Sequence, residues 1–73
     1  MRLHYYPETD SLYIELSGAA SADSREVAPN VVLDFDAQGD LVGIDIDHAS
    51  LVVDLSSLEA RGLPIADLSL TQR

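Results

Sequence analysis

Residues 31–47 read VVLDFDAQGDLVGIDID and carry the strongest structural signal in the chain. Apolar and polar residues alternate on both sides of Gln38-Gly39, and a glycine after a polar residue favours the positive φ of a tight turn. Pairing Ala37 with Asp40 therefore predicts a β-hairpin whose facing apolar residues share one side. The apolar pairs are Phe35 with Val42, Leu33 with Ile44, and Val31 with Ile46. A slip of one residue would move all of them to the polar side, so burial of one face should fix this register.

Residues 1–17 predict a second hairpin on the same plan, with the turn residues Pro7-Glu8-Thr9-Asp10 between two β-rich runs. Pairing Tyr6 with Ser11 gives one apolar and one polar side. The apolar pairs are Tyr5 with Leu12, Leu3 with Ile14, and Met1 with Leu16, and the polar pairs are Arg2 with Glu15 and His4 with Tyr13. The facing opposite charges of Arg2 and Glu15 support this register.

The segment between the hairpins, GAASAD at residues 18–23, predicts a loop, and residues 24–28 predict a short edge strand with few apolar anchors. Pro29-Asn30 then marks a turn, because proline cannot donate to a ladder and asparagine tolerates turn geometry. No crossover long enough for a parallel pair occurs before Asp47. We therefore expect an α+β fold: an antiparallel β-meander of four to five strands with one C-terminal helix packed on one face.

The helix is predicted over residues 48–62, where Leu51, Leu55 and Leu58 recur at helical spacing. Asp47 suits the N-cap and Gly62 suits the C′ position. A capping-box pattern at residues 56–59 also allows the helix to break and restart there. A helix is needed over the apolar face, since a single sheet of this size leaves that face wet.

The domain organisation follows from these elements. We expect a single α+β domain over residues 1–61 and a C-terminal tail over residues 62–73. The tail contains Ile65, Leu68 and Leu70, which are too apolar for a chain end that is fully exposed to solvent. Packing on its own sheet, on a symmetry mate or on another protein would order it, and the sequence leaves this choice open.

Length and composition narrow the function classes. A chain of 73 residues buries only about 60% of its unfolded surface, so association with a partner would help its stability. The net charge is −9, from 13 acidic and 4 basic residues with no lysine, which argues against nucleic-acid binding. This charge favours a basic partner, or else simply keeps a small domain dispersed. No cysteine is present, which excludes disulfides and thiolate metal sites. The lack of a leader pattern and of a membrane-span pattern predicts a cytoplasmic protein.

Three segments carry a family resemblance. They are YPETDSLYI at residues 6–14, EVAPNVVLD at residues 26–34, and GDLVGIDI at residues 39–46 followed by Ala49-Ser50. In this order they resemble the YuzE-like small bacterial protein family, domain of unknown function 2283. The resemblance implies a compact α+β fold with no established activity and no catalytic residues. Some relatives lie beside small toxin-like proteins, so the resemblance also implies an antitoxin-like or partner-binding role.

The sequence contains no recognisable catalytic motif, and we assign no catalytic residue, cofactor or metal ligand. Residues 34–45 match most of a calcium-loop pattern, but such a loop needs flanking helices and a final bidentate Glu. The hairpin register explains these residues better. His4 and His48 lie far apart in sequence, and neither accompanies a recognisable nucleophile motif.

The outer side of the hairpins is the candidate interface, because it gathers tyrosines, which are favoured where proteins meet. In the main hairpin this side pairs Val32 with Asp45, Asp34 with Gly43, and Asp36 with Leu41. The candidate interface residues are His4, Tyr6, Tyr13, Val32, Leu41, Ile65 and Leu68. We expect a protein-interaction module that forms a homodimer, binds a small basic protein partner, or does both. The alternative is a ligand-binding or hydrolytic site at a subunit interface, built from outer-face carboxylates and His4.

Overall fold

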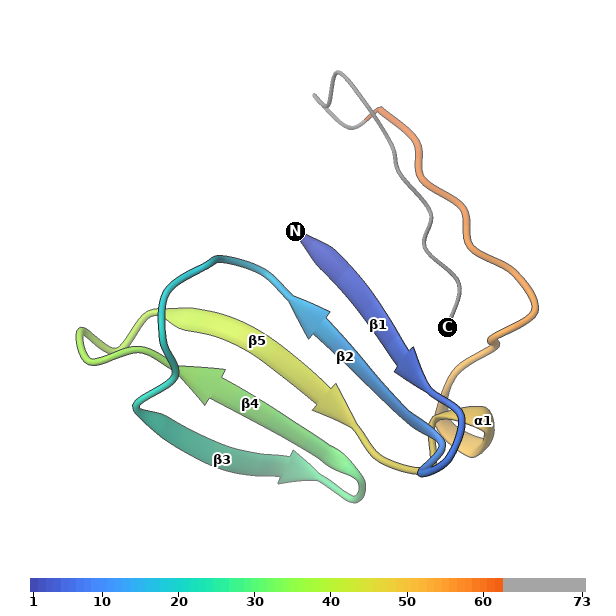
Figure 1. Ribbon diagram of the computed structural model, residues 1–73, viewed down its shortest axis with the longest axis horizontal. Helices are drawn as coiled ribbons and strands as arrows, with labels where there is room; N and C mark the ends of the chain where they lie inside the picture. Colours follow the sequence, from blue (N-terminus) through green and yellow to red (C-terminus); the bar gives the residue numbers. More distant parts are fainter. Residues whose placement is uncertain (63–73) are drawn as a thin grey trace.

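The computed structural model of the chain describes residues 1–62 and contains one five-stranded antiparallel sheet and one short helix (Figure 1). The strands are β1 (Arg2–Tyr6), β2 (Ser11–Glu15), β3 (Asp23–Ala28), β4 (Val31–Phe35) and β5 (Leu41–Ile46), and the helix is α1 (Ala49–Val52). The predicted α+β class with an antiparallel sheet and a C-terminal helix is confirmed. Among the described residues, no helix has the length and apolar character needed to cross a membrane.

The strands lie in the order β1-β2-β5-β4-β3, so the two predicted hairpins meet where β2 pairs with β5. After β2 the chain crosses to the far edge of the sheet, forms β3, and returns through β4 and β5 (Figure 1). β3 is an edge strand, as expected for a segment with few apolar anchors, and its register shifts between Glu26 and Ala28. All six of its residues are exposed, so β3 contributes little to the core.

The predicted registers are confirmed over most of both hairpins. In the first hairpin, the pairing runs from Arg2 with Glu15 to Tyr6 with Ser11, as predicted. In the main hairpin, the confirmed pairs are Val31 with Ile46, Val32 with Asp45, Leu33 with Ile44, and Asp34 with Gly43. The predicted pair of Phe35 with Val42 is wrong, because Phe35 lies opposite Leu41 and the register shifts at this point.

The turn of the main hairpin explains this shift. The N–H of Gly39 donates to the carbonyl of Asp36 at 3.0 Å, and the N–H of Asp36 donates to the carbonyl of Asp40 at 2.9 Å. This pattern gives a three-residue loop with Gly39 at φ 86° in the left-handed region, instead of the predicted two-residue loop. The carboxylate of Asp36 also accepts the N–H groups of Gln38 and Asp40. A bulge at Val42 accommodates the extra residue of the longer loop.

Alternation along the paired strands gives the sheet two chemically different faces. We call one the apolar face; apart from Leu41 beside the hairpin loop and the β3 residues Asp23 and Arg25, it comprises Leu3, Tyr5, Leu12, Ile14, Val31, Leu33, Phe35, Val42, Ile44 and Ile46. We call the other the outer face; it comprises Arg2, His4, Tyr6, Ser11, Tyr13, Glu15, Ser24, Glu26, Val32, Asp34, Gly43 and Asp45. The sequence pattern predicts this separation, and the register places it across the strands.

The apolar face is largely open. Among the described residues, the buried apolar side chains are Val42 (3% exposed), Ile46 (7%) and Ala49 (0%). The other residues of the apolar face are half-buried, except Leu3, which is 46% exposed. The sheet therefore forms one layer of a core whose second layer is not supplied by residues 1–62.

The predicted helix over residues 48–62 is too long, because α1 ends at Val52. Val53 has an extended backbone, and the carboxylate of Asp54 accepts both the N–H and the hydroxyl of Ser56. β-Branched residues and such local bonds both compete with helix formation. Leu51 is 83% exposed, so the short helix also gains little from packing. The N-cap is His48, not Asp47 as predicted.

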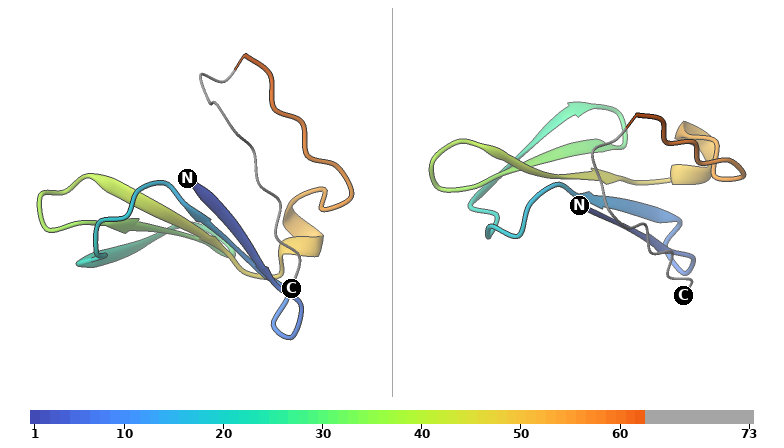
Figure 2. Two further views of the ribbon diagram at one scale, coloured as in Figure 1. Left: turned by 45° about the horizontal axis from the view of Figure 1, so that its top comes forward. Right: turned by 90° about the horizontal axis from the view of Figure 1, so that it is seen from above.

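Beyond α1, residues 53–62 lead away from the sheet on the β1 side (Figures 1 and 2). Their apolar side chains include Leu55 and Leu58, which are exposed. This segment therefore does not cover the apolar face as the predicted helix would. The predicted tail over residues 62–73 lies, apart from Gly62, outside the described residues, and so do the candidate interface residues Ile65 and Leu68.

One carboxylate ties α1 to the end of the sheet. Asp10, in the turn between β1 and β2, accepts the hydroxyl of Tyr5 at 2.7 Å and the hydroxyl of Ser50 at 2.6 Å. Its carbonyl accepts the N–H of Ala49 at 2.8 Å. We call this set the Asp10 clamp. The hydrogen bonds from Ser50 and then from Tyr5 lower the pKa of Asp10, because they favour its charged form.

Replacing Gly39 tests the turn. Gly39→Ala should lower the free energy of unfolding by about 1–2 kcal/mol, because an L side chain is strained at φ 86°. Gly18→Ala is the matched control, since Gly18 has no positive φ and an added Cβ there meets no atom within 4 Å. Urea unfolding of both variants measures the difference, and equal midpoints would contradict the turn geometry.

The Asp10 clamp predicts a pH dependence. Because the folded pKa of Asp10 lies below its ordinary value, its stabilising contribution is complete above the unfolded pKa and is lost as pH falls through the folded pKa. Asp10→Asn keeps a residue that tolerates the left-handed φ of 53° but removes the charge. The stability difference between wild type and Asp10→Asn should therefore shrink as pH falls below about 4. A constant difference in thermal unfolding from neutral to acidic pH would exclude this role.

Candidate functional site

The outer face brings several predicted interface residues into one row. His4 on β1 pairs with Tyr13 on β2, Tyr13 pairs with Asp45 on β5, and Asp45 pairs with Val32 on β4. Tyr6 also projects from this face, two residues beyond His4. Leu41 does not join the row, because the shifted register places it opposite Phe35 and not opposite Asp36. The row therefore crosses four adjacent strands.

Tyr13 is held in place by two contacts on the outer face. Its hydroxyl donates to Asp34 at 2.9 Å, and Asp34 accepts a second hydrogen bond of 2.6 Å from the hydroxyl of Ser24. The ring of Tyr13 leans over Gly43, where an added Cβ would overlap the phenol group. Burial, followed by the hydrogen bond and charge of Asp34, raises the pKa of the Tyr13 hydroxyl, so it stays a donor at neutral pH. Gly43 thus makes room for a fixed tyrosine ring.

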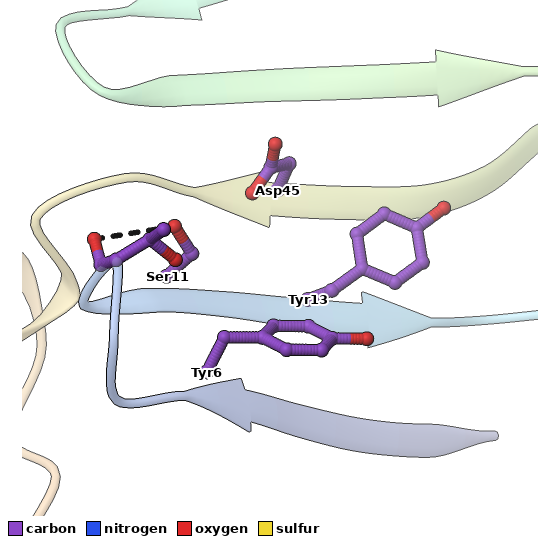
Figure 3. Close-up of a pocket in the computed structure, with 5 residues that line it drawn as sticks. Tyr6, Ser11, Tyr13 and Asp45 are labelled. Carbon is purple, nitrogen blue, oxygen red and sulfur yellow. Dashed lines mark hydrogen bonds between the residues drawn. The ribbon is translucent and has the colours of Figure 1, made fainter.

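A shallow depression of about 450 Å³ lies beside this ring. Its lining residues are Tyr6, Thr9, Ser11, Tyr13 and Asp45. Figure 3 shows that the rings of Tyr6 and Tyr13 lie beside one another, with their hydroxyl groups pointing away from the Ser11 end of the depression. Tyr6 is 43% exposed and stacks on His4, with 6.4 Å between the ring centroids. The depression thus has two aromatic walls and a carboxylate at its side.

The carboxylate of Asp45 is in an unfavourable electrostatic position. Burial raises its pKa first, and the charges of Asp47 and Asp34 raise it further. Glu15 shows the opposite behaviour, because its hydrogen bonds with Arg2 lower its pKa. Within residues 1–62, Asp45 has no hydrogen-bond donor and no cation paired with its side chain. A positively charged group beside Asp45 would therefore be favourable.

The remaining polar residues are used in other ways. Asp36 serves the hairpin turn, and Asp34 anchors Tyr13 and Ser24. His48 lies outside the outer face, after β5, where its Nδ1 is 3.0 Å from the side-chain oxygen of Asn30. In the part of the chain that the structure describes, no three His, Cys, Asp or Glu side chains group closely enough to hold a metal ion.

The sequence pattern places His4, Tyr13 and Val32 on the outer face, wrongly adds Leu41, and does not identify Thr9, Ser11 and Gly43 as parts of the site. Gly43 carries a usable signal, because a glycine inside a strand pattern often marks a close approach of another group. Thr9 and Ser11 carry none, since turn residues of this type are common on any surface.

Comparison with known proteins adds one match. A family model described as "Protein of unknown function (DUF2283)" matches residues 2–50. No curated protein and no solved structure matches the chain. The matched segment contains all five strands and ends at Ser50, the residue whose N–H and hydroxyl both bond to Asp10. The family match thus coincides with the sheet and the Asp10 clamp.

The packing of Tyr13 over Gly43 can be tested with a double-mutant cycle. Gly43→Ala should lower the free energy of unfolding by about 1–3 kcal/mol, because the new methyl group displaces the Tyr13 ring. In a Tyr13→Ala background the same change should cost much less, since nothing remains to be displaced. Urea unfolding of the four proteins gives the coupling energy. Additive effects would show that the ring does not occupy this position.

Proposed function

Because the chain belongs to the DUF2283 family of proteins of unknown function, its role must come from its surfaces, and we propose that it is a protein-interaction module that pairs with a second copy of itself through the apolar face. The observation that carries this proposal is the open second layer of the core. Ten apolar-face side chains line one side of the sheet, and of these only Val42 and Ile46 are buried. Covering these side chains with a second copy would stabilise the dimer by roughly 25 cal/mol for each Å² of apolar surface removed from water.

The size of the apolar face suits a dimer. Strands lie about 4.8 Å apart and rise about 3.3 Å per residue, so five strands of about five residues cover roughly 400 Å² in projection. The accessible area of projecting side chains is larger than this projection. A standard interface takes roughly 800 Å² from each partner, so the apolar face supplies about half of that area or more. Two such sheets would pack face to face about 10 Å apart.

The charge distribution favours the apolar face over the outer face as the surface for self-association. A two-fold interface brings the same patch of both subunits together, so the patch has to be complementary to itself. On β1, β2, β4 and β5 the apolar face carries no charge, and on the edge strand β3 it carries Asp23 and Arg25, whose opposite charges lie 3.8 Å apart. The outer face, in contrast, carries Glu15, Asp34 and Asp45, and two copies of it would repel one another. The outer face therefore remains available for a different partner, and an interaction with a small basic protein fits the net charge of −9.

Substitutions at two neighbouring residues of β1 test which face forms the dimer interface. Leu3→Glu places a charge on the apolar face, and His4→Glu places the same charge on the outer face of the same strand. Because Leu3 is 46% exposed, the substitution should cost the single chain little. We expect Leu3→Glu to weaken the dimer by about tenfold or more, because the dimer would bury an unpaired charge, and His4→Glu to leave it nearly unchanged.

Sedimentation equilibrium over a range of protein concentrations measures both variants against wild type. A dimer that dissociates with His4→Glu but not with Leu3→Glu would move the interface to the outer face. A wild-type protein that stays monomeric at all concentrations would contradict the proposal. Added salt should strengthen the wild-type dimer, since it screens the repulsion between two chains of charge −9.

A further inference from the structure

We infer that the depression on the outer face, lined by Tyr6, Thr9, Ser11, Tyr13 and Asp45, receives an arginine side chain of a basic partner protein. This inference rests on the proposal that the protein acts by binding other proteins, and it names the chemistry of one partner. It does not depend on the dimer, because the depression lies on the face opposite to the apolar face.

The shape and composition of the depression match a guanidinium group. A guanidinium is planar, stacks on aromatic rings, and presents paired N–H donors that fit a carboxylate. Here Tyr6 and Tyr13 supply the aromatic surface, and Asp45 supplies the carboxylate beside them (Figure 3). The hydroxyl of Ser11 donates to the carbonyl of Thr9 at 3.4 Å, so its oxygen is left to accept a further N–H.

The walls of the depression are already ordered. Tyr13 is fixed by its hydrogen bond to Asp34 and by its position over Gly43. Tyr6 is braced by stacking on His4. An ordered site loses less conformational entropy when it binds, so even a small contact area yields useful affinity.

The cation has to come from outside residues 1–62. Arg2 is paired with Glu15, Arg61 is paired with Glu59, and the guanidinium of Arg25 lies 4.4 Å from the centre of the Phe35 ring. These are all the arginines among the described residues, and the chain has no lysine. The net charge of −9 would steer a basic partner toward the protein.

The probe for the test is the blocked tripeptide acetyl-Gly-Arg-Gly-amide, titrated into the full chain and followed by the backbone amide and tyrosine signals in NMR spectra. The peptide with citrulline in place of arginine is the neutral control of the same shape. We expect the arginine peptide to shift the signals of Tyr6, Tyr13 and Asp45, and the citrulline peptide to bind at least about tenfold more weakly. Equal binding of the two peptides would overturn the inference.

Three variants locate the binding. Asp45→Asn should weaken binding of the arginine peptide by about tenfold, because the charged partner is lost. Tyr6→Ala should also weaken binding of the arginine peptide. Because the Tyr6 side chain is exposed, this substitution should leave the fold intact. Asp40→Asn is the matched control, since it removes one charge from the hairpin loop, away from the depression. If Asp40→Asn weakens binding as much as Asp45→Asn does, the attraction is general and the inference fails.

A titration with spermidine separates a protein partner from a small polyamine. Binding of spermidine to the same residues as tightly as the arginine peptide would overturn the assignment to an arginine side chain. Sedimentation of Asp45→Asn keeps the two proposals apart. If Asp45→Asn stays dimeric while it binds the arginine peptide more weakly, the two surfaces act separately as inferred. A wild-type protein that dimerises but does not bind the arginine peptide refutes only this inference, whereas a wild-type protein that does not self-associate refutes the proposed function.

Discussion

The alternation of apolar and polar side chains along β2, β4 and β5 constrains the rest of the structure, because it places every large aliphatic side chain of these strands except Val32 on one side of a single sheet. Such a sheet is stable only when a second layer covers its apolar side. In residues 1–62 the helix that should supply this layer is a single turn, held at the end of the sheet by Asp10. The apolar face is open because α1 is too short to cover it. This open face is the reason for proposing a second copy.

The carboxylates of the outer face differ in their hydrogen-bond partners. Two of its carboxylates have donors, since Glu15 has Arg2 and Asp34 has Tyr13 and Ser24. Among residues 1–62, Asp45 and the exposed Glu26 of the edge strand β3 have none, and of these two it is Asp45 whose pKa is raised, by burial and by neighbouring acidic groups. The same hydrogen bond that satisfies Asp34 also fixes the ring beside Asp45. Structural support and binding chemistry are therefore shared between neighbouring residues.

The sheet could be predicted from the sequence, because burial of one face penalises every register except one. The main hairpin turn was predicted one residue too short, since the deciding factor was the carboxylate of Asp36 bonding to Gln38 and Asp40, which alternation does not reveal. The helix was predicted too long for a related reason. Leucine spacing favours a helix over residues 48–62, but local bonds at Asp54 and the lack of an apolar partner for Leu51 outweigh it.

The outer-face row was predictable from register, whereas the depression was not, because it depends on how the Tyr13 ring leans over Gly43.

The most direct test of the central claim is NMR relaxation of side-chain methyl groups by an uncharged paramagnetic agent in solution. If two copies pair through the apolar face, the methyl groups of Ile14, Leu33 and Ile44 should be protected at high protein concentration and should lose this protection on dilution. Methyl relaxation on the apolar face that is strong and independent of concentration would contradict the account.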